Sequence, residues 1–352
     1  MINRRSVERI LVIRLRYLGD VVLLDPVHRA LRARFPEAEI FSLVPSGAVG
    51  LVERSSHRVR PLAWDAAHPL RSLRGLLGRR YDVVIDLTGS DRSAFISLLT
   101  GAGTRIAYSS RREAWWCWKK FCYTSRLLHE KVKPHIIVQH LTLLEKLLQV
   151  PPQGTDIVVN LHTEEREWAE SFLSGMDCGR PLVFVHITSR DMQKSLPART
   201  VAEALRELIA AGARVVYSIG PSEPEKKFAR EVMGVLGEPG RGVFLAVEPP
   251  DWWRLCALIS KADVFWGADS APMHVAAAFR KPLLVFFGPS DARHWRPLNA
   301  EAEVCVLPCR CLNNKKICPP GVAGQCLAEV STGEIVERLM RLLAEAARRW
   351  SL

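Results

Sequence analysis

The sequence predicts an α/β protein made of two doubly wound domains, each built on a parallel sheet. Short apolar and β-branched runs alternate with segments of helical periodicity, which is the pattern of parallel strands covered by helices. The alternation continues through all 352 residues, which is enough chain for two domains of about 150 to 180 residues. A turn-rich stretch, Val150 to Asp156, separates the two halves.

Each half contains its own set of expected strands. In the first half they are Arg9 to Leu15, Glu39 to Val44, Tyr81 to Leu87 and Thr104 to Tyr108. In the second half they are Leu182 to Ile187, Arg214 to Ile219, Val243 to Val247, Ala262 to Trp266 and Pro282 to Phe287. Helices are expected over Glu164 to Leu173 and Thr332 to Trp350. We expect one domain over residues 1–165 and a second over residues 166–352.

The composition is that of a globular protein, with 48% hydrophobic and 24% charged residues. No apolar stretch approaches the roughly 18 residues that a membrane helix needs, and the N-terminus lacks the apolar centre of a signal peptide. We therefore expect a cytoplasmic protein with reduced thiols. Four cysteines cluster near the C-terminus without the usual pair of C-x2-C knuckles, which makes a bound metal the weaker alternative to structural thiols. They are Cys309, Cys311, Cys318 and Cys326.

The net charge of +12 belongs entirely to the first half of the chain. Residues 1–150 hold 25 Lys and Arg against 13 Asp and Glu, whereas residues 151–352 hold 24 against 24. A positive field confined to one half favours a polyanionic partner: nucleic acid, an anionic membrane surface or a phosphorylated substrate. The alternative is a generally basic proteome.

An acidic residue interrupts a basic segment at the point where the first strand should end. In "RLRYLGDVVLLDPVHRALRARFP", Arg14 to Pro36, the residues Leu18, Gly19 and Asp20 separate the strand from an amphipathic helix. A glycine turn and a helix N-terminus at this edge of a sheet form an anion-friendly point. Asp20 is therefore either a helix N-cap or a functional carboxylate. The G-x-G-x-x-G pattern is missing, which argues against NAD or FAD.

A second stretch predicts a site for a diphosphate. "ADVFWGADSAPMHVAAAFRKPLLVFFGPSDARHWRPL", Ala262 to Leu298, is expected to form a strand, an acidic loop, a helix of small residues and another strand. Gly267 to Ala271 supplies small residues whose amides can approach an anion, and Pro272 stands at a favoured first-turn position. His274 can add a further donor to a phosphate.

Together these stretches resemble glycosyltransferase family 9, the heptosyltransferases that build the inner core of lipopolysaccharide. Both occur in the expected order and separation, and the resemblance continues through "CLAEVSTGEIVERLMRLL". It implies a GT-B architecture, in which two Rossmann-like domains face each other across a cleft. It also implies an inverting, metal-independent transfer without a cofactor. The nucleotide-sugar would bind to the C-terminal domain and the acceptor to the N-terminal domain, which is the basic half.

The resemblance assigns Asp20 as the base that takes the proton of the acceptor hydroxyl. Lys194 is assigned to the phosphates, with Arg190 as the alternative contact, and Asp269 is expected to order its loop by accepting amide hydrogens. Glu225, or less convincingly Glu223, is expected to accept the ribose hydroxyls, although either could instead favour the start of a helix. The complete nucleotide-sugar set is Thr188, Ser189, Arg190, Lys194, Glu225, Asp269, Ser270, Ala271 and His274.

The acceptor is expected to contact basic residues of the first half. These are Arg14, Arg16, Arg111, Arg112, Lys119 and Lys120. Within Tyr108 to Thr124, basic residues are interleaved with Trp115, Trp116, Trp118 and Phe121, a mixture that suits anionic headgroups. Nucleic-acid stacking would use the same residue types, and a partly buried helix with basic flanks is the structural alternative.

The leading expectation is therefore an enzyme that moves a heptose from ADP-heptose to a phosphorylated glycolipid. It would attach peripherally to the cytoplasmic surface of the inner membrane and would have no nucleic-acid partner. One alternative is the same chemistry with another nucleotide-sugar or another glycan acceptor. A more distant alternative is a non-catalytic basic module that binds nucleic acid.

Overall fold

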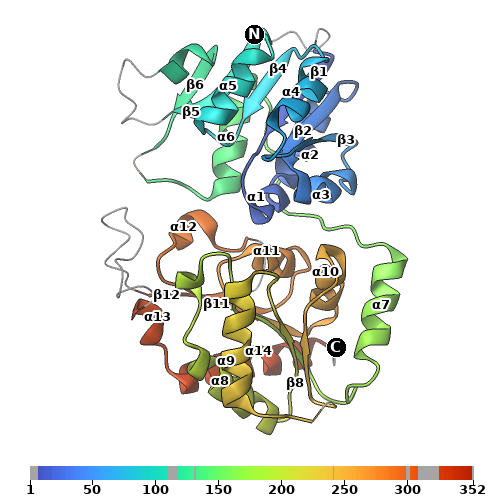
Figure 1. The fold of residues 1–352 in the computed structure, drawn as a ribbon, viewed down its shortest axis with the longest axis vertical. Helices are drawn as coiled ribbons and strands as arrows, with labels where there is room; N and C mark the ends of the chain where they lie inside the picture. The colour runs from blue at the N-terminus through green and yellow to red at the C-terminus, as the bar shows by residue number, and fades with distance from the viewer. Residues whose placement is uncertain are drawn as a thin grey trace. The chain divides into compact units, whose positions relative to one another are not determined.

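The chain divides into two compact units, Met1–Asn160 and Leu161–Leu352. The computed structural model in Figure 1 describes residues 7–109, 118–130, 132–240, 242–298, 302–307 and 325–350. Each unit is built on one six-stranded parallel sheet, which confirms the predicted α/β class with two doubly wound sheets. The division falls just before α7 (Thr163–Leu173), whereas the boundary expected after residue 165 lies inside that helix.

The first unit has the strand order β3-β2-β1-β4-β5-β6. Its strands are β1 (Arg9–Ile13), β2 (Glu39–Pro45), β3 (Val59–Trp64), β4 (Val83–Asp86), β5 (Thr104–Ser109) and β6 (Ser125–Leu128). Its helices are α1 (Leu18–Val22), α2 (Asp25–Arg34), α3 (Val49–Glu53), α4 (Pro69–Leu77), α5 (Asp91–Leu99) and α6 (Ile136–Leu148), with short 3-10 turns η2 (Ser46–Ala48) and η3 (Trp118–Phe121).

The sheet of the first unit is covered on both faces, because its central strand β1 is apolar on both sides. Leu11 and Ile13 join one core with Leu76 of α4 and Ile96 of α5. Successive side chains of a strand point to opposite faces, so the equally buried Ile10 and its neighbour Val12 face away from that core. Helices α2 and α6 pack against each other. The result is a rigid sheet whose strand ends can position polar side chains.

The second unit repeats the same topology, with the strand order β12-β11-β10-β7-β8-β9. Its strands are β7 (Leu182–His186), β8 (Arg214–Ser218), β9 (Phe244–Val247), β10 (Val264–Gly267), β11 (Leu283–Phe287) and β12 (Ala302–Val306). Its remaining helices are η4 (Met192–Lys194), α8 (Ala198–Ala210), α9 (Glu223–Leu236), α10 (Trp252–Lys261), α11 (Ala271–Ala278), α12 (Ala292–Trp295), α13 (Gln325–Ala328) and α14 (Thr332–Trp350).

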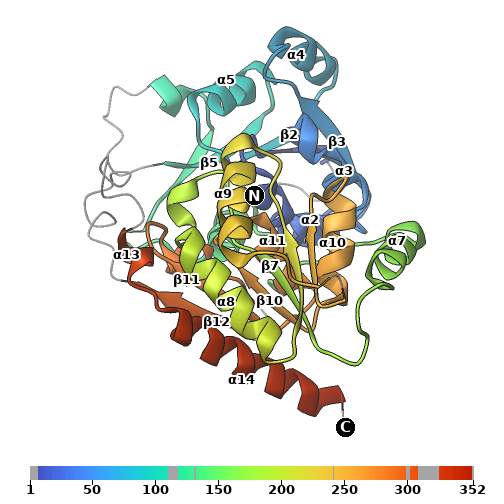
Figure 2. The same ribbon diagram turned by 60° about the horizontal axis from the view of Figure 1, so that its bottom comes forward.

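The core of the second unit lies between this sheet and three helices. Val183 and Val185 of β7 pack with Leu205 of α8, Val232 of α9 and Leu339 of α14. Helix α14 lies against α8, as Figure 2 shows, so the C-terminal helix packs within its own unit. None of the described helices is both long enough and apolar enough to cross a membrane.

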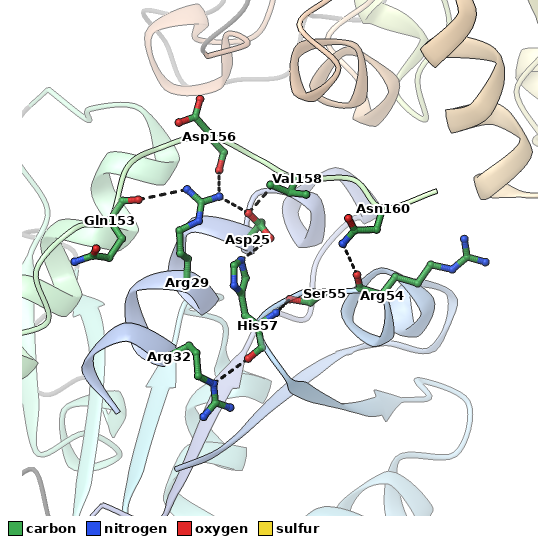
Figure 3. A network of polar contacts seen from close by, with 10 residues as sticks. All are labelled: Asp25, Arg29, Arg32, Arg54, Ser55, His57, Gln153, Asp156, Val158 and Asn160. Carbon is green, nitrogen blue, oxygen red and sulfur yellow. Dashed lines mark hydrogen bonds and ion pairs between the residues drawn. The ribbon is translucent and has the colours of Figure 1, made fainter. Parts of the chain in front are cut away.

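The connector between the units is fastened to the first unit by Arg29 and Asp25 of α2 (Figure 3). The Arg29 guanidinium donates to the carbonyl oxygens of Gln153 at 3.3 Å and Asp156 at 2.6 Å, and it pairs with Asp25 at 2.7 Å. The Val158 amide donates to the same carboxylate at 3.3 Å. Hydrogen bonds from the Arg29 side chain to backbone carbonyls therefore hold the predicted linker on unit 1.

Three strands, β3, β6 and β12, were not expected from the sequence. All three lie at the edge of a sheet. Arg60 and Ala63 of β3 and most of β6 are exposed. An edge strand needs no continuous apolar run because one side has no neighbouring strand to bury it, so these segments lack the signal that marks the central strands.

Candidate functional site

The two sheets place their candidate residues at equivalent positions. In each unit the strand order reverses between the first and the fourth strand, which are β1 and β4 in unit 1 and β7 and β10 in unit 2. Open parallel sheets bind ligands beyond the carboxyl ends of the strands at such a reversal. The candidate functional residues therefore form two groups, one at the reversal point of each unit, and we describe each group separately.

In unit 1, Asp20 is buried in the first turn of a helix. Helix α1 begins at Leu18 after the extended residue Tyr17, so Asp20 is the third helical residue and not the N-cap that one interpretation expected. Its carboxylate accepts a hydrogen bond from the Tyr17 amide at 3.2 Å. Gly19 lies inside α1 and not in a turn, and the expected single helix is two, because α2 starts separately at Asp25.

Arg14 fixes the position of Asp20. This arginine follows β1, and its side chain and that of Asp20 are each 5% exposed. The guanidinium donates to the Asp20 carboxylate and to the Leu87 carbonyl, while its Nε has no recorded partner. Burial lowers the pKa of Arg14, and the adjacent Asp20 charge opposes that shift. A guanidinium held in this way is suited to orienting Asp20, a different role from the expected contact with acceptor.

A second buried carboxyl, Asp86, lies beside this pair. It ends β4 and is level with Ile13 of β1 in the sheet register. The amides of Thr88 and Gly89 donate to it at 2.8 and 3.1 Å, and the Tyr123 hydroxyl donates at 2.5 Å. Burial raises the pKa of Asp86. The sequence analysis missed this residue because it lies within the apolar run from Tyr81 to Leu87.

The remaining acceptor candidates are only partly within the described residues. Arg16 is exposed next to the Arg14–Asp20 pair. Lys119 pairs with Asp91 at 2.9 Å and donates to the Gly89 carbonyl at 3.3 Å, which ties η3 to the loop after β4. The Lys120 ammonium lies 4.8 Å from the centre of the Phe121 ring. The other members of the expected set, Arg111 and Arg112, lie outside the described residues, as do the interleaved Trp115 and Trp116.

In unit 2, Lys194 and Asp269 form an ion pair across the reversal point. Lys194 belongs to η4, which follows β7, and Asp269 follows β10. Their Nζ and Oδ2 atoms are 2.7 Å apart, and the two side chains are 28% and 8% exposed. Within the described residues the hydrogen bond recorded to Asp269 comes from Lys194, not from the loop amides that the sequence analysis expected. Lys194 therefore holds in place the loop after β10 that contains Asp269.

Helix α11 begins directly beyond this pair. Ser270 is its N-cap, Ala271 its first residue, and Pro272 lies in the first turn, as expected. His274 is buried in the same turn. A Cβ atom on Gly267 would lie 2.2 Å from the Phe265 ring and 3.3 Å from the His186 carbonyl. Glycine is therefore needed at the end of β10, before the loop that contains Asp269. The N-terminus of α11, the positive end of its helix dipole, suits an anion.

Glu225 has both of its carboxylate oxygens engaged near the start of α9. Thr188 donates to Oε1 at 3.0 Å, and the amide and hydroxyl of Ser222 donate to Oε2 at 3.1 and 2.6 Å. Glu225 thus closes a capping box, the helix-start alternative named above, while Glu223 is exposed on the same turn. A Cβ on Gly220 would lie 1.9 Å from Glu225 Oε1, which explains a glycine there. Carboxylate oxygens accept several hydrogen bonds, so ribose binding stays a prediction.

Two further candidates of the nucleotide-sugar set, Ser189 and Arg190, follow β7. The Ser189 hydroxyl donates to the Asp191 carbonyl at 2.7 Å, and Arg190 is exposed. Behind them the buried His186 ring lies 3.1 Å from the Ser218 hydroxyl, and burial lowers the pKa of His186 to about 4. The Lys194–Asp269 pair, the start of α11 and Glu225 are therefore the candidate residues of unit 2.

Residues 70–320 match the sequence model of Glycosyltransferase family 9 (heptosyltransferase). The chain belongs to this family. As a family 9 member it is a glycosyltransferase, and its two Rossmann-like sheets are the GT-B architecture. The resemblance stated from the sequence is confirmed.

Characterised family 9 proteins match the chain over most of its length. The lipopolysaccharide heptosyltransferase 3 of Escherichia coli is 26% identical over 302 residues, which cover 80% of this chain and 84% of that protein. The solved ADP-heptose LPS heptosyltransferase II of E. coli has a TM-score of 0.77 at 22% identity, covering 96% and 99% of the two chains. A family 9 structure from Veillonella parvula has a TM-score of 0.80 at 21% identity, covering 96% and 98%.

Most of the clustered cysteines of this family 9 chain lie outside the residues that the structure describes. Cys309, Cys311 and Cys318 are outside the described residues, and Cys326 is half-buried with its Sγ close to Gly288. In the part of the chain that the structure describes, no three His, Cys, Asp or Glu side chains are grouped to hold a metal ion.

Proposed function

We propose that this protein transfers a heptose from ADP-heptose to a phosphorylated oligosaccharide of the lipopolysaccharide inner core. The observation that carries the proposal is the match to the heptosyltransferase family, together with an oriented acid in the basic unit and an anion-binding edge in the other. Relatives named lipopolysaccharide heptosyltransferases support the acceptor. A related E. coli heptosyltransferase solved with ADP supports the donor.

In the proposed reaction Asp20 is the base. Its carboxylate takes the proton of the acceptor hydroxyl while that oxygen forms a bond to the anomeric carbon of the heptose. The bond between the anomeric carbon and the diphosphate oxygen breaks, ADP leaves with the electron pair, and attack from the opposite face inverts the anomeric configuration. Arg14 holds Asp20 in place, so positioning carries a large share of the rate enhancement.

The leaving diphosphate is proposed to bind to unit 2 without a metal ion. Lys194 and the first-turn N–H groups of α11, with Ser270, Ala271 and His274, would stabilise the charge that develops on it. Glu225 would accept the ribose hydroxyls. Thr188 holds Glu225 in place, while the exposed Arg190 and the neighbouring Ser189 lie near enough in sequence to reach the phosphates. Asp269 would hold Lys194 in position before substrate arrives, which suits stabilisation without a metal ion.

The acceptor is proposed to bind to unit 1, which carries the positive excess of the chain. Arg16, Lys119 and Lys120 remain candidates for its phosphates, as do Arg111 and Arg112. Because a lipid anchors such an acceptor, we propose that the enzyme works peripherally at the cytoplasmic surface of the inner membrane. Nucleic acid is not a partner in this proposal.

Incubation of the purified protein with a panel of nucleotide-sugars and defined, deacylated core acceptors, analysed by mass spectrometry, tests the function. We expect a mass increase of one heptose with ADP-heptose, and full activity in EDTA. Transfer from another nucleotide-sugar alone would establish the alternative donor. If RNA or DNA raises the melting temperature and ADP does not, the chain is a nucleic-acid-binding module and the proposal fails.

A further inference from the structure

Helix α5 is apolar on both sides. Ala94 and Ile96 point into the core of unit 1, as an amphipathic helix requires. Phe95, Leu98 and Leu99 occupy the opposite side, where Phe95 is 49% exposed. A helix that is apolar all round is normally buried on all sides. The outward stripe of α5 therefore lacks a covering layer within the described residues.

Two neighbouring elements extend this apolar surface. On α4, which shares the core cluster of α5, Leu70 is 81% exposed and Leu77 is also exposed. On η3, which contacts α5, Trp118 is exposed and Phe121 is 68% exposed. Figure 2 draws α4 and α5 next to each other. We name these seven residues the α4–α5 face: Leu70, Leu77, Phe95, Leu98, Leu99, Trp118 and Phe121.

Unit 2 has no counterpart of the α4–α5 face among its described residues. The exposed large hydrophobic residues found there are Val235 and Val306, one on α9 and one on the edge strand β12. Single exposed apolar residues are normal on any protein, whereas a contiguous group marks an interaction surface. The concentration on three adjoining elements of one unit therefore indicates contact with an apolar partner.

Arginines surround the α4–α5 face. Arg71 and Arg74 lie on the exposed side of α4, Arg79 and Arg80 follow that helix, and Arg92 is exposed on α5. Asp91 is the acidic residue on α5 and already pairs with Lys119, while Asp65 and Asp82 lie before and after α4. The charge next to the apolar residues is thus strongly positive. An apolar patch with a basic surround fits an anionic lipid surface, because apolar side chains enter the acyl boundary while guanidinium groups bind headgroup phosphates.

We propose that the α4–α5 face docks unit 1 onto an anionic lipid bilayer. The inference deepens the proposed function and rests on it for the choice of partner, because a lipid-anchored acceptor requires the enzyme to work at a bilayer. It differs from the expectation based on Tyr108 to Thr124, because α4 and most of the apolar surface lie outside that stretch. The leucine and phenylalanine side chains of the α4–α5 face would insert into the acyl boundary of the bilayer, and Arg71 and Arg74 would bind the anionic headgroups.

Cosedimentation of the full chain with vesicles, without donor or acceptor, tests the charge component. We expect binding to phosphatidylglycerol-containing vesicles and much weaker binding to pure phosphatidylcholine. Because each basic residue near an anionic surface contributes about fivefold, Arg71→Gln with Arg74→Gln should weaken binding by about 25-fold. The matched control is Lys227→Gln with Arg230→Gln, two exposed basic residues at the same spacing on α9 of unit 2, which should leave binding unchanged.

A second pair of variants tests the apolar component. Leu77→Ser and Val235→Ser remove apolar side chains that are each 41% exposed, so both should fold equally well. Only Leu77→Ser should reduce vesicle binding, by severalfold, and Phe95→Ser with Leu98→Ser should reduce it further. Circular dichroism of each variant verifies folding.

Vesicle binding that fails in the wild-type chain, or that survives all α4–α5 substitutions, would overturn the proposal. So would sedimentation equilibrium showing that the face joins two copies of the chain, with the same substitutions restoring a monomer. Transfer to a deacylated, water-soluble acceptor should be unchanged in every variant. If the wild-type chain does not transfer heptose to this soluble acceptor, the proposed function fails instead. Failure of membrane docking and failure of the proposed function are therefore distinguishable.

Discussion

The two units carry the same kind of ion pair at the same topological position, but in different settings. In unit 1 the Arg14–Asp20 pair is almost fully buried, with both side chains 5% exposed. In unit 2 the Lys194–Asp269 pair combines a buried carboxylate with a lysine that is 28% exposed. A buried arginine cannot leave its acid without a large penalty, whereas a half-exposed lysine can exchange partners at small cost.

This difference favours different roles for two similar pairs. In unit 1 the acid, Asp20, would act on the substrate, and Arg14 would hold it in position. In unit 2 the cation would be the working group, because a diphosphate can compete for Lys194 while Asp269 keeps it in place until substrate binds. One fold, used twice, can therefore supply a base in one unit and an anion site in the other.

The largest expected effect tests the role of the acid in unit 1. Asp20→Asn should lower turnover by about a thousandfold, because an amide cannot take the acceptor proton and general-base catalysis contributes about 10²- to 10⁴-fold. The affinity for ADP, measured by calorimetry, should be unchanged, since ADP is assigned to unit 2. Near-normal turnover would reduce Asp20 to a helix-capping residue.

The next prediction concerns the support of that acid. Arg14→Met should lower the free energy of unfolding by about 3–5 kcal/mol, because it leaves the Asp20 charge buried without its partner. Adding Asp20→Asn to the same chain should restore part of that loss, which urea denaturation of the single and double variants measures. Equal losses for Arg14→Met and Lys194→Met would remove the contrast between the units.

A property shared by the two units gives a smaller, pH-dependent effect. Burial lowers the pKa of His28, which is 2.7 Å from Ser42 Oγ, and that of His186 to about 4. In the unfolded chain each ring takes up a proton below about pH 6.5, so the unfolded state binds more protons as pH falls. The contribution of these two histidines to the free energy of unfolding is therefore complete above pH 6.5. The free energy of unfolding falls toward pH 4, by on the order of 3 kcal/mol per histidine.

Urea denaturation across this pH range measures the effect in each unit. His28→Gln keeps a hydrogen-bonding group near Ser42, and His186→Asn keeps one near Ser218. Each variant should flatten the decline between pH 6.5 and 4. A decline of unchanged slope in the double variant would show that other groups control the acid sensitivity.

Much of the fold was predictable because the central strands are buried on both sides. Runs such as Leu182 to Val185 are apolar at four successive buried positions, which makes them visible in the sequence. The edge strand Val59–Trp64 was invisible for the opposite reason, since it contains exposed Arg60 and an internal proline. Burial, and not strand formation as such, is what the apolar pattern records.

The candidate site was predictable only for residues that break a local pattern. Asp20 was found because an acid in a basic segment at the end of a strand is unusual. Its pairing with Arg14 depends on the Leu87 carbonyl from β4's end, which only the folded sheet brings close. Asp86 was missed because it lies within an apolar run, and the hydrogen bond to Glu225 from Thr188 comes from the loop after β7. Pairing between distant segments leaves no local sequence signal.

The smallest effect sharpens the contrast from the side of unit 2. Lys194→Met should weaken ADP binding by about tenfold, the loss of one charge-assisted hydrogen bond to a phosphate. It should lower the free energy of unfolding by less than Arg14→Met does, because only the acid of the Lys194–Asp269 pair is buried. Adenosine, which has no phosphate, is the matched ligand and should bind to the variant and the wild-type chain equally. If adenosine weakens as much as ADP, Lys194 acts through Asp269 and the loop before α11 and does not contact the diphosphate.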